Sequence, residues 1–256
     1  MTKYRHPLCL VLMMLVLAAC SKDTRNDQLV GPASTNKVAL SNLNLGIEYM
    51  QNKEYEKSLE NLNKALAADP KYTPTYNALA VLYQRLGKNE QADQYFKKAL
   101  SINADDPHTL NNYGQFLCST NHYDVAQALF MKAAANPLYE SQEIALTNAG
   151  TCALNNNHPD VAENNFKRAL EKNPKIPTAL IQMAKLSYAN GNYLSARAFL
   201  QRYLEIANQT PASLWLGIQI EQKLGDKNTL SSYALLLKNN FPDSREAGLL
   251  KESGIK

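Results

Sequence analysis

A period of about 34 residues runs through most of this chain and constrains the fold more than any other feature of the sequence. Apolar and small residues recur at matching offsets in six successive segments. The segments begin near Ala39, Thr73, Pro107, Glu143, Pro177 and Pro211. Each contains two amphipathic stretches with apolar residues at helical spacing, which predicts a helix, a turn and a second helix. Because one such pair cannot bury its apolar stripe alone, we expect the pairs to stack around a continuous core.

This pattern resembles the tetratricopeptide repeat, a helix–turn–helix unit of the same length. The matching residues of the first four units are Leu45, Gly46, Tyr49, Leu62, Ala65, Pro70, Leu79, Ala80, Tyr83, Ala92, Phe96, Ala99, Tyr113, Gly114, Leu117, Ala126, Phe130, Ala133, Ala149, Gly150, Ala162, Phe166, Ala169 and Pro174. Units five and six match less well. The resemblance implies an all-α, right-handed superhelix of about six repeats over residues 39–244, with a concave groove. Residues 245–256 are expected to extend the terminal cap or to fray.

The first 19 residues have the features of an export signal. Lys3 and Arg5 form a short basic head, and residues 8–19 are apolar without interruption. Such a run is shorter than the roughly 18 apolar residues that a membrane-spanning helix needs, and it suits the core of a secretory signal. The sequence therefore predicts a chain that is exported rather than threaded through a membrane.

The stretch Leu17-Ala18-Ala19-Cys20 resembles the bacterial lipobox. In lipoproteins with this motif, the cysteine sulfur takes a diacylglycerol, cleavage precedes the cysteine, and its new amino group is acylated. The resemblance implies a lipid-anchored Cys20 and no other cofactor, and Ser21 implies delivery to the periplasmic face of the outer membrane. The alternative is a plain signal peptide with an incidental cysteine. Residues 20–38 are polar and contain Gly31-Pro32, so we expect a flexible tether there.

The charge composition restricts the kinds of partner that the chain is expected to bind. Without residues 1–19 the chain has 25 Lys and Arg against 23 Asp and Glu, which gives no support to nucleic-acid binding.

Export also places Cys118 and Cys152 in an oxidising compartment. They fall on neighbouring first helices, where packed helices bring Cα atoms within disulfide distance, so a Cys118–Cys152 disulfide is expected. Two buried free thiols are the alternative.

Motifs for covalent chemistry are absent from the sequence. It contains no nucleotide-binding loop, no zinc-protease motif, no nucleophile elbow and no Cys/His cluster with metal-ligand spacing. His108, His122 and His158 fall in predicted turns or at helix starts, where solvated roles are expected. We therefore predict no catalytic residue, no metal site, no enzymatic activity and no small-molecule substrate.

The tetratricopeptide resemblance also implies a peptide-binding groove lined by the first helix of each unit. In the first two units the corresponding positions are Leu43, Ile47, Met50, Asn77, Val81, Gln84 and Arg85. The three from the first unit, together with Val81, predict an apolar patch at the end of the groove nearest the tether, with Gln84 and Arg85 as its polar rim. The alternative is that the apolar residues are packed beneath the linker or against the terminal helix.

Signal, lipobox, tether and repeats together resemble the type IV pilus biogenesis lipoproteins of the PilF/PilW type, the pilotins. The most specific parts are "YGQFLC" and "NPLY" within residues 111–139, followed by "NAGTCAL" at residues 148–154. The resemblance implies an outer-membrane lipoprotein that promotes localisation and multimerisation of the secretin through which the pilus emerges. The alternative keeps this architecture but binds periplasmic proteases or cell-wall enzymes, as NlpI-type adaptors do.

Overall fold

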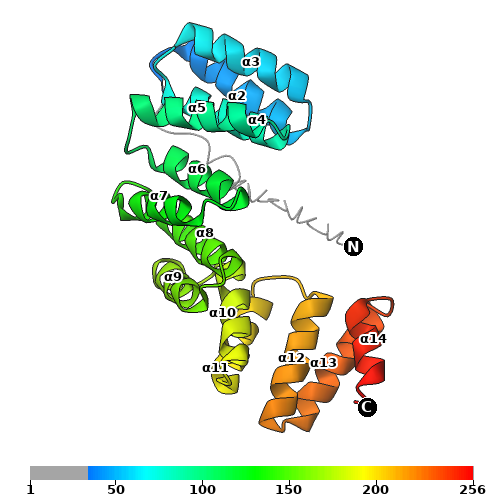
Figure 1. Ribbon diagram of the computed structural model, residues 1–256. Helices are drawn as coiled ribbons and strands as arrows, with labels where there is room; N and C mark the ends of the chain where they lie inside the picture. The colour runs from blue at the N-terminus through cyan, green and yellow to red at the C-terminus, as the bar shows by residue number, and fades with distance from the viewer. Residues whose placement is uncertain (1–33, 256) are drawn as a thin grey trace, which may run out of the picture.

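The structure, a computed structural model, describes residues 34–255, and within that range it consists of thirteen helices and no strand. Twelve of the helices form six successive pairs, and the last helix follows the sixth pair (Figure 1). The all-α prediction is therefore confirmed. The expected signal peptide, the lipidated Cys20 and most of the expected tether lie outside the described residues.

The first helix of each pair begins within two residues of a predicted unit start. The helices are α2 (Lys37–Gln51), α3 (Tyr55–Ala68), α4 (Thr73–Arg85), α5 (Asn89–Ile102), α6 (Pro107–Ser119), α7 (Tyr123–Ala135), α8 (Gln142–Asn155), α9 (Pro159–Lys172), α10 (Pro177–Ala189), α11 (Tyr193–Leu204), α12 (Pro211–Leu224), α13 (Lys227–Asn240) and α14 (Arg245–Glu252). The predicted tether end at residue 38 is two residues too late, because Asn36 caps α2 by accepting bonds from the N–H groups of Val38 and Ala39.

One left-handed residue closes the turn inside every pair. These residues have positive φ and recur with the repeat: Lys53, Gly87, Asn121, Asn157, Gly191 and Gly225. In all six turns, the N–H of the following residue bonds the carbonyl five positions back, as from His122 to Leu117 at 2.8 Å. This Schellman geometry satisfies the last carbonyls of the first helix and reverses the chain.

Within a pair, the helices approach most closely where a glycine of the first helix faces a large residue of the second. The glycine and its partner are Gly46 and Leu62, Gly114 and Phe130, Gly150 and Phe166, and Gly217 and Tyr233. A Cβ atom built on Gly114 or Gly150 would lie only 2.7 Å from the facing ring, so the helix backbones could not come this close with any larger residue.

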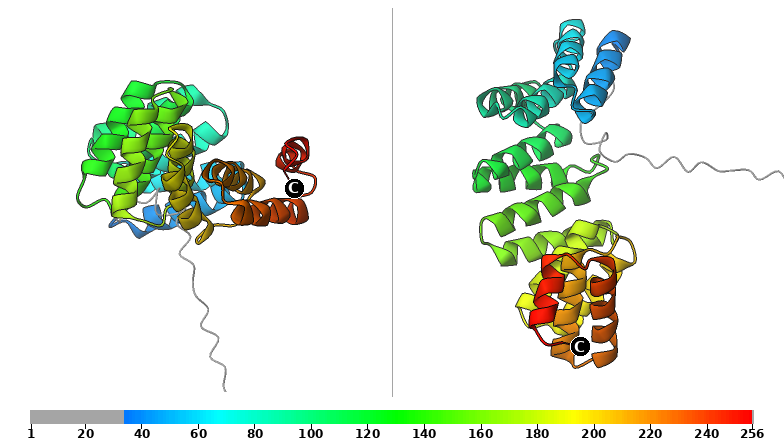
Figure 2. Two further views of the ribbon diagram at one scale, coloured as in Figure 1. Left: turned by 90° about the horizontal axis from the view of Figure 1, so that it is seen from below. Right: turned by 90° about the vertical axis from the view of Figure 1, so that its right-hand side faces the viewer.

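Successive pairs are stacked along the molecule (Figure 2). First helices contact one another directly in the pairs α2/α4, α4/α6, α6/α8 and α10/α12, whereas second helices pack mainly against the first helices of their own and the following unit. The first helices therefore line the inner side of the stack. Partly buried residues such as Val81 and Leu129 each pack against two neighbouring clusters, so the core is continuous from unit to unit.

The sixth unit is a better repeat than its sequence predicted. Gly217 keeps the close contact with Tyr233, but α12 extends to Leu224 and the turn to α13 has only two residues, so turn and packing follow different registers. Gly225 keeps the offset that Asn121 has in the third unit, whereas Gly217 lies one position earlier in its unit than Gly114 does, so the repeat pattern does not reveal the contact. Helix α14 covers the end of the stack with Ala247 and Leu250, which join the cluster of α12 and α13, so residues 245–252 extend the cap.

Candidate partner-binding face

The inner sides of α4, α6 and α8 are joined by a ladder of asparagine side chains. Asn148 Nδ2 donates to Asn111 Oδ1 at 2.9 Å, and Asn111 Nδ2 donates to the neighbouring Asn112 Oδ1 at 3.4 Å. Asn112 Nδ2 then donates to Asn77 Oδ1 at 3.2 Å. Asn77, Asn111 and Asn112 are buried, and Asn148 is half-buried. We call these four residues the asparagine ladder; it crosses three successive units.

The prediction of an exposed apolar patch in the first unit is wrong. Leu43, Ile47 and Met50 have exposed fractions of 0%, 2% and 0%. They belong to a cluster with residues of α3 and α4 that includes Leu62 and Leu79. Their positions on α2 lie where α4 is stacked against the first unit, so they fill the gap between the first two pairs and present no surface to a partner.

The second-unit residues keep a place on the inner side, with different exposures. Asn77, Val81 and Gln84 lie on one stripe of α4, at i, i+4 and i+7. Asn77 is fully buried, whereas Val81 and Gln84 are half-buried. Arg85 is exposed, and its Nη1 donates to the carbonyl of Met50 at 3.1 Å, so its charge lies at the C-terminal end of α2.

Sequence reasoning found Asn77 but did not include the rest of the ladder among the site residues. A signal for it exists, because Asn111 occupies the same offset in the third unit as Asn77 in the second, and Asn148 the same offset in the fourth as Asn112 in the third. The pairing of these offsets across units depends on how far successive first helices are shifted along each other. That shift depends on how the helices pack in three dimensions, and the period of the sequence gives no information about it.

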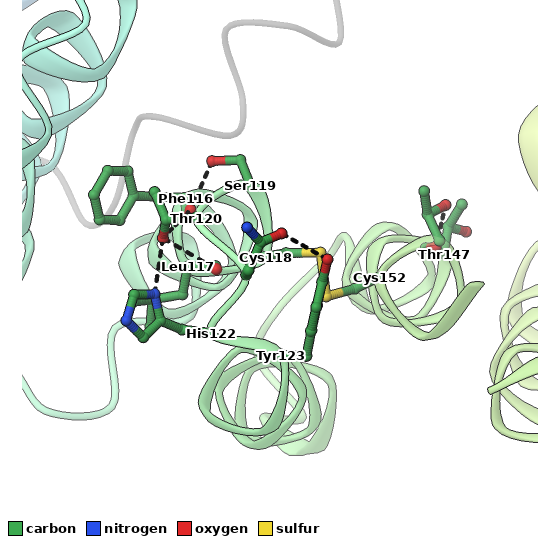
Figure 3. The surroundings of a disulfide bond; sticks show 11 residues. Phe116, Leu117, Cys118, Ser119, Thr120, His122, Tyr123, Thr147 and Cys152 are labelled. Carbon is green, nitrogen blue, oxygen red and sulfur yellow. Dashed lines mark hydrogen bonds between the residues drawn. A yellow bond between two sulfur atoms is a disulfide. The ribbon is translucent and has the colours of Figure 1, made fainter. Parts of the chain in front are cut away.

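A disulfide fixes the third unit to the fourth on this side. Cys118 of α6 and Cys152 of α8 are bonded, with Cα atoms 5.8 Å apart (Figure 3). Tyr123 lies beside the bond, and its hydroxyl donates to Asn121 Oδ1 at 2.7 Å. The bond holds two of the helices that carry the asparagine ladder in one register.

A polar contact also links α5 to α6. The Tyr113 hydroxyl donates to Asp93 Oδ1 at 2.6 Å, and Lys97 Nζ lies 2.6 Å from the other carboxylate oxygen. Burial raises the pKa of Tyr113 above its ordinary range, and the bond to Asp93 raises it further. Burial opposes ionisation of Asp93, but the bonds from Lys97 and Tyr113 outweigh it and hold its pKa below the ordinary value. The Tyr113–Asp93 contact joins the second helix of one unit to the first helix of the next.

The described part of the chain offers little for metal chemistry. Over residues 34–255, no three His, Cys, Asp or Glu side chains are grouped so that they would hold a metal ion. His122 and His158 are exposed, as expected, but His108 is half-buried and its ring packs edge-on against Tyr139 at 5.2 Å. The solvated role predicted for His108 is therefore wrong. No helix in the same range is both long and apolar enough to cross a membrane.

Paired helices of this length, stacked with the first helices inside, define a tetratricopeptide-repeat protein. Tetratricopeptide family models match residues 37–105 and 153–216.

Particular relatives narrow this class. The chain is 32% identical to the type IV pilus assembly protein PilF of Pseudomonas aeruginosa over 204 residues, which cover 80% of this chain and 81% of that protein. The solved structure of P. aeruginosa PilF matches with a TM-score of 0.78 and 30% identity, covering 85% of this chain and 98% of the other. PilW, described as a widely conserved type IV pilus biogenesis factor, matches with a TM-score of 0.73, 32% identity and coverage of 84% and 99%. The chain belongs to this PilF/PilW family of type IV pilus biogenesis proteins.

Proposed function

We propose that this chain is a pilotin: a lipid-anchored scaffold on the periplasmic face of the outer membrane that binds secretin subunits and promotes their multimerisation. The observation that carries this proposal is the similarity to PilF, at 32% identity over four fifths of both chains. A role in type IV pilus biogenesis follows from membership of that family. The secretin as partner and the outer membrane as address are our proposals.

In the proposed mechanism, the lipidated N-terminus and the helical stack have different roles. Acyl chains on Cys20, each CH₂ of which contributes about 0.8 kcal/mol on burial, would hold the protein at the membrane. The helical stack would bind an unassembled secretin subunit and raise the effective concentration of subunits for ring assembly. The protein acts in this scheme by binding and placing its partner, without making or breaking bonds.

Deleting the gene and restoring it on a plasmid tests this function. We expect loss of twitching motility and of heat-stable secretin multimers in the deletion strain, and recovery of both with the wild-type gene. Normal multimers and piliation in the deletion strain, with altered proteolysis of envelope proteins, would instead favour an adaptor for periplasmic enzymes.

A Cys20→Ser variant separates membrane localisation from partner binding. We expect it to incorporate no radiolabelled palmitate and to leave the outer-membrane fraction, while the soluble protein still captures secretin. Palmitate incorporation by the variant would contradict the proposed anchor at position 20. So would a wild type that incorporates no palmitate.

A further inference from the structure

A groove lies between α7 and α9, the second helices of units three and four, next to the C-terminal end of α8. Its volume is about 200 Å³. Tyr123 of α7 and Val161 of α9 contribute apolar surface, and so do Cys152 and Ala153 of α8. Sites that enclose a whole small molecule usually measure about 300–1,000 Å³. This groove is smaller and suits one long side chain of a partner.

The apolar part of the groove is fixed before any partner arrives. Cys152 is buried and is bonded to Cys118. The Tyr123 ring lies beside that bond, and its hydroxyl donates to Asn121 Oδ1 at 2.7 Å (Figure 3). Because these groups are already held in place, binding a side chain against them costs little ordering of the groove itself.

The polar part of the groove carries one carboxylate and no lysine or arginine. Asp124 lines it and is exposed, and Gln127 and Asn156 line it with half-buried amides whose oxygens can accept hydrogen bonds. His158 also lines the groove and is exposed. In the part of the chain that the structure describes, no Lys, Arg or His lies within ion-pair distance of Asp124.

A second groove, at the equivalent place between units one and two, differs in its charges. Tyr55 and Glu56 occupy the offsets of Tyr123 and Asp124 there. Two lysines line that groove as well, and one of them, Lys57, forms an ion pair with a carboxylate of the same helix end. The chain therefore supplies its own cations in the first groove, whereas the groove between α7 and α9 lacks them.

The charge and shape of the groove between α7 and α9 restrict its occupant. An anionic group would be repelled by Asp124, and a purely apolar side chain would cover that carboxylate without pairing it, which is unfavourable. An arginine fits both parts, because its stem can lie along apolar surface while its planar guanidinium rests on an aromatic ring and donates to several acceptors. Lysine has a compact, strongly hydrated charge and matches such a site less well.

We propose that the groove between α7 and α9 binds an arginine side chain of the secretin, with the guanidinium donating to the Asp124 carboxylate and the stem against Tyr123 and Val161. This inference rests on the proposed function and adds the place on the stack and the kind of side chain that the partner presents. A hydrogen-bonded pair of this kind is stronger than an ordinary surface ion pair once the partner covers it.

The test captures detergent-solubilised subunits of the secretin encoded in the same genome. The immobilised chain starts at residue 20 and carries Cys20→Ser. Every hydrophobic cluster of the structure lies between residues 39 and 255, so this chain keeps all packed elements. We expect Asp124→Asn to lower the amount of secretin captured at limiting concentration by about tenfold or more, as expected for loss of a charged hydrogen bond.

Val125→Lys tests the groove without removing a group that lines it. Val125 is 54% exposed and occupies the offset of Lys57, so the new lysine would give the groove a cation of its own and should lower capture as Asp124→Asn does. Two controls should capture secretin as the wild type does. Val125→Gln adds length without charge, and Glu90→Gln removes the first-turn carboxylate at the equivalent offset of α5. Circular dichroism melting shows whether each variant is folded.

Competition identifies the side chain that is bound. N-acetyl-arginine amide, N-acetyl-lysine amide and N-acetyl-citrulline amide are added in turn to secretin held by the wild-type chain. Citrulline has nearly the shape of arginine but no charge. We expect the arginine compound to displace secretin at a lower concentration than the lysine compound, and the citrulline compound to displace none.

Four results would overturn the inference. Equal capture by the wild type, Asp124→Asn and Val125→Lys would remove the groove as a site and leave the proposed function standing, whereas no capture by any folded chain would remove both. Displacement by the citrulline compound as effective as by the arginine compound, or by none of the three, would exclude arginine as the occupant. A wild-type dimer that Asp124→Asn dissociates in sedimentation would assign the groove to a second copy of this chain.

Discussion

Gly114 of α6 faces the ring of Phe130 in α7 so closely that a Cβ on the glycine would lie 2.7 Å from Cε1 of the phenylalanine. Phe130 is fully buried and cannot move aside without disturbing the core of its unit. We therefore expect Gly114→Ala to lower the free energy of unfolding by about 1–3 kcal/mol, the usual cost of overpacking. Urea denaturation followed by circular dichroism measures it.

Gly248→Ala is the control for that substitution. Gly248 is also helical, in α14, but a Cβ there would meet no atom within 4 Å. Without a clash, alanine is the better helix former, and we expect a gain of about 0.5–1 kcal/mol. Effects of opposite sign in the two variants would support the close-packing account; a stabilising Gly114→Ala would refute it.

Lys53 is the one left-handed turn residue that is neither glycine nor asparagine, with φ of 63°. The left-handed region disfavours a residue with a long side chain, so Lys53→Gly should raise the free energy of unfolding by about 0.5–1 kcal/mol. Asn157, with φ of 55° in the fourth unit, tolerates this conformation, and Asn157→Gly should change little. A destabilising Lys53→Gly would show that the turn is not strained.

The Cys118–Cys152 bond closes a loop with a sequence separation of 34. On the chain-entropy model, such a bond contributes about 3–4 kcal/mol. We expect the Cys118→Ser, Cys152→Ser double variant, and the wild type under reducing conditions, to unfold at lower urea concentration by matching amounts. Thiol counting on denatured, unreduced protein provides the check: reactive thiols from both residues would contradict the bond.

Tyr139 and Tyr113 predict how stability depends on alkaline pH. Burial is the main cause that raises the pKa of each above its ordinary value near 10, and the raised folded-state pKa makes the contribution complete below pH 10 and lost as pH rises further. We therefore expect the free energy of unfolding to be level from about pH 7 to 9 and to fall beyond about pH 10.

Phenylalanine variants separate these two tyrosines. The Tyr139 hydroxyl is buried without a partner, so Tyr139→Phe should cost nothing at pH 7 and should reduce the alkaline loss. Tyr113→Phe should also reduce that loss, but at pH 7 it should cost about 1 kcal/mol or more because the bond to Asp93 is removed. Urea titrations at pH 7 and above pH 10 compare them, and an unchanged alkaline slope in both variants would contradict the assignment.

Periodicity located the helices because each repeat has to bury the same stripe. The unit starts, the pairing and the small residues at close approaches, such as Gly46 and Gly114, all follow from that requirement. The pattern does not predict the role of Gly217, because one more residue separates it from the turn residue Gly225 than separates Gly114 from Asn121.

The binding face was harder to predict because exposure depends on the neighbouring unit. Leu43 and Asn77 occupy equivalent positions in the first and second units, and both are fully buried. The leucine fills the gap between helix pairs, whereas the asparagine enters a polar chain that continues into α6. The sequence identifies the shared position in the repeat. The stacked structure is needed to show that the Asn77 amide nitrogen has no hydrogen-bond partner there.

Capture of detergent-solubilised secretin subunits by the immobilised mature chain tests the central claim most directly. We predict that the wild-type chain retains secretin and that resin without the chain does not. Absence of secretin from the eluate, with the immobilised chain folded by circular dichroism, would contradict the claim that this stack of helices is a scaffold for secretin assembly.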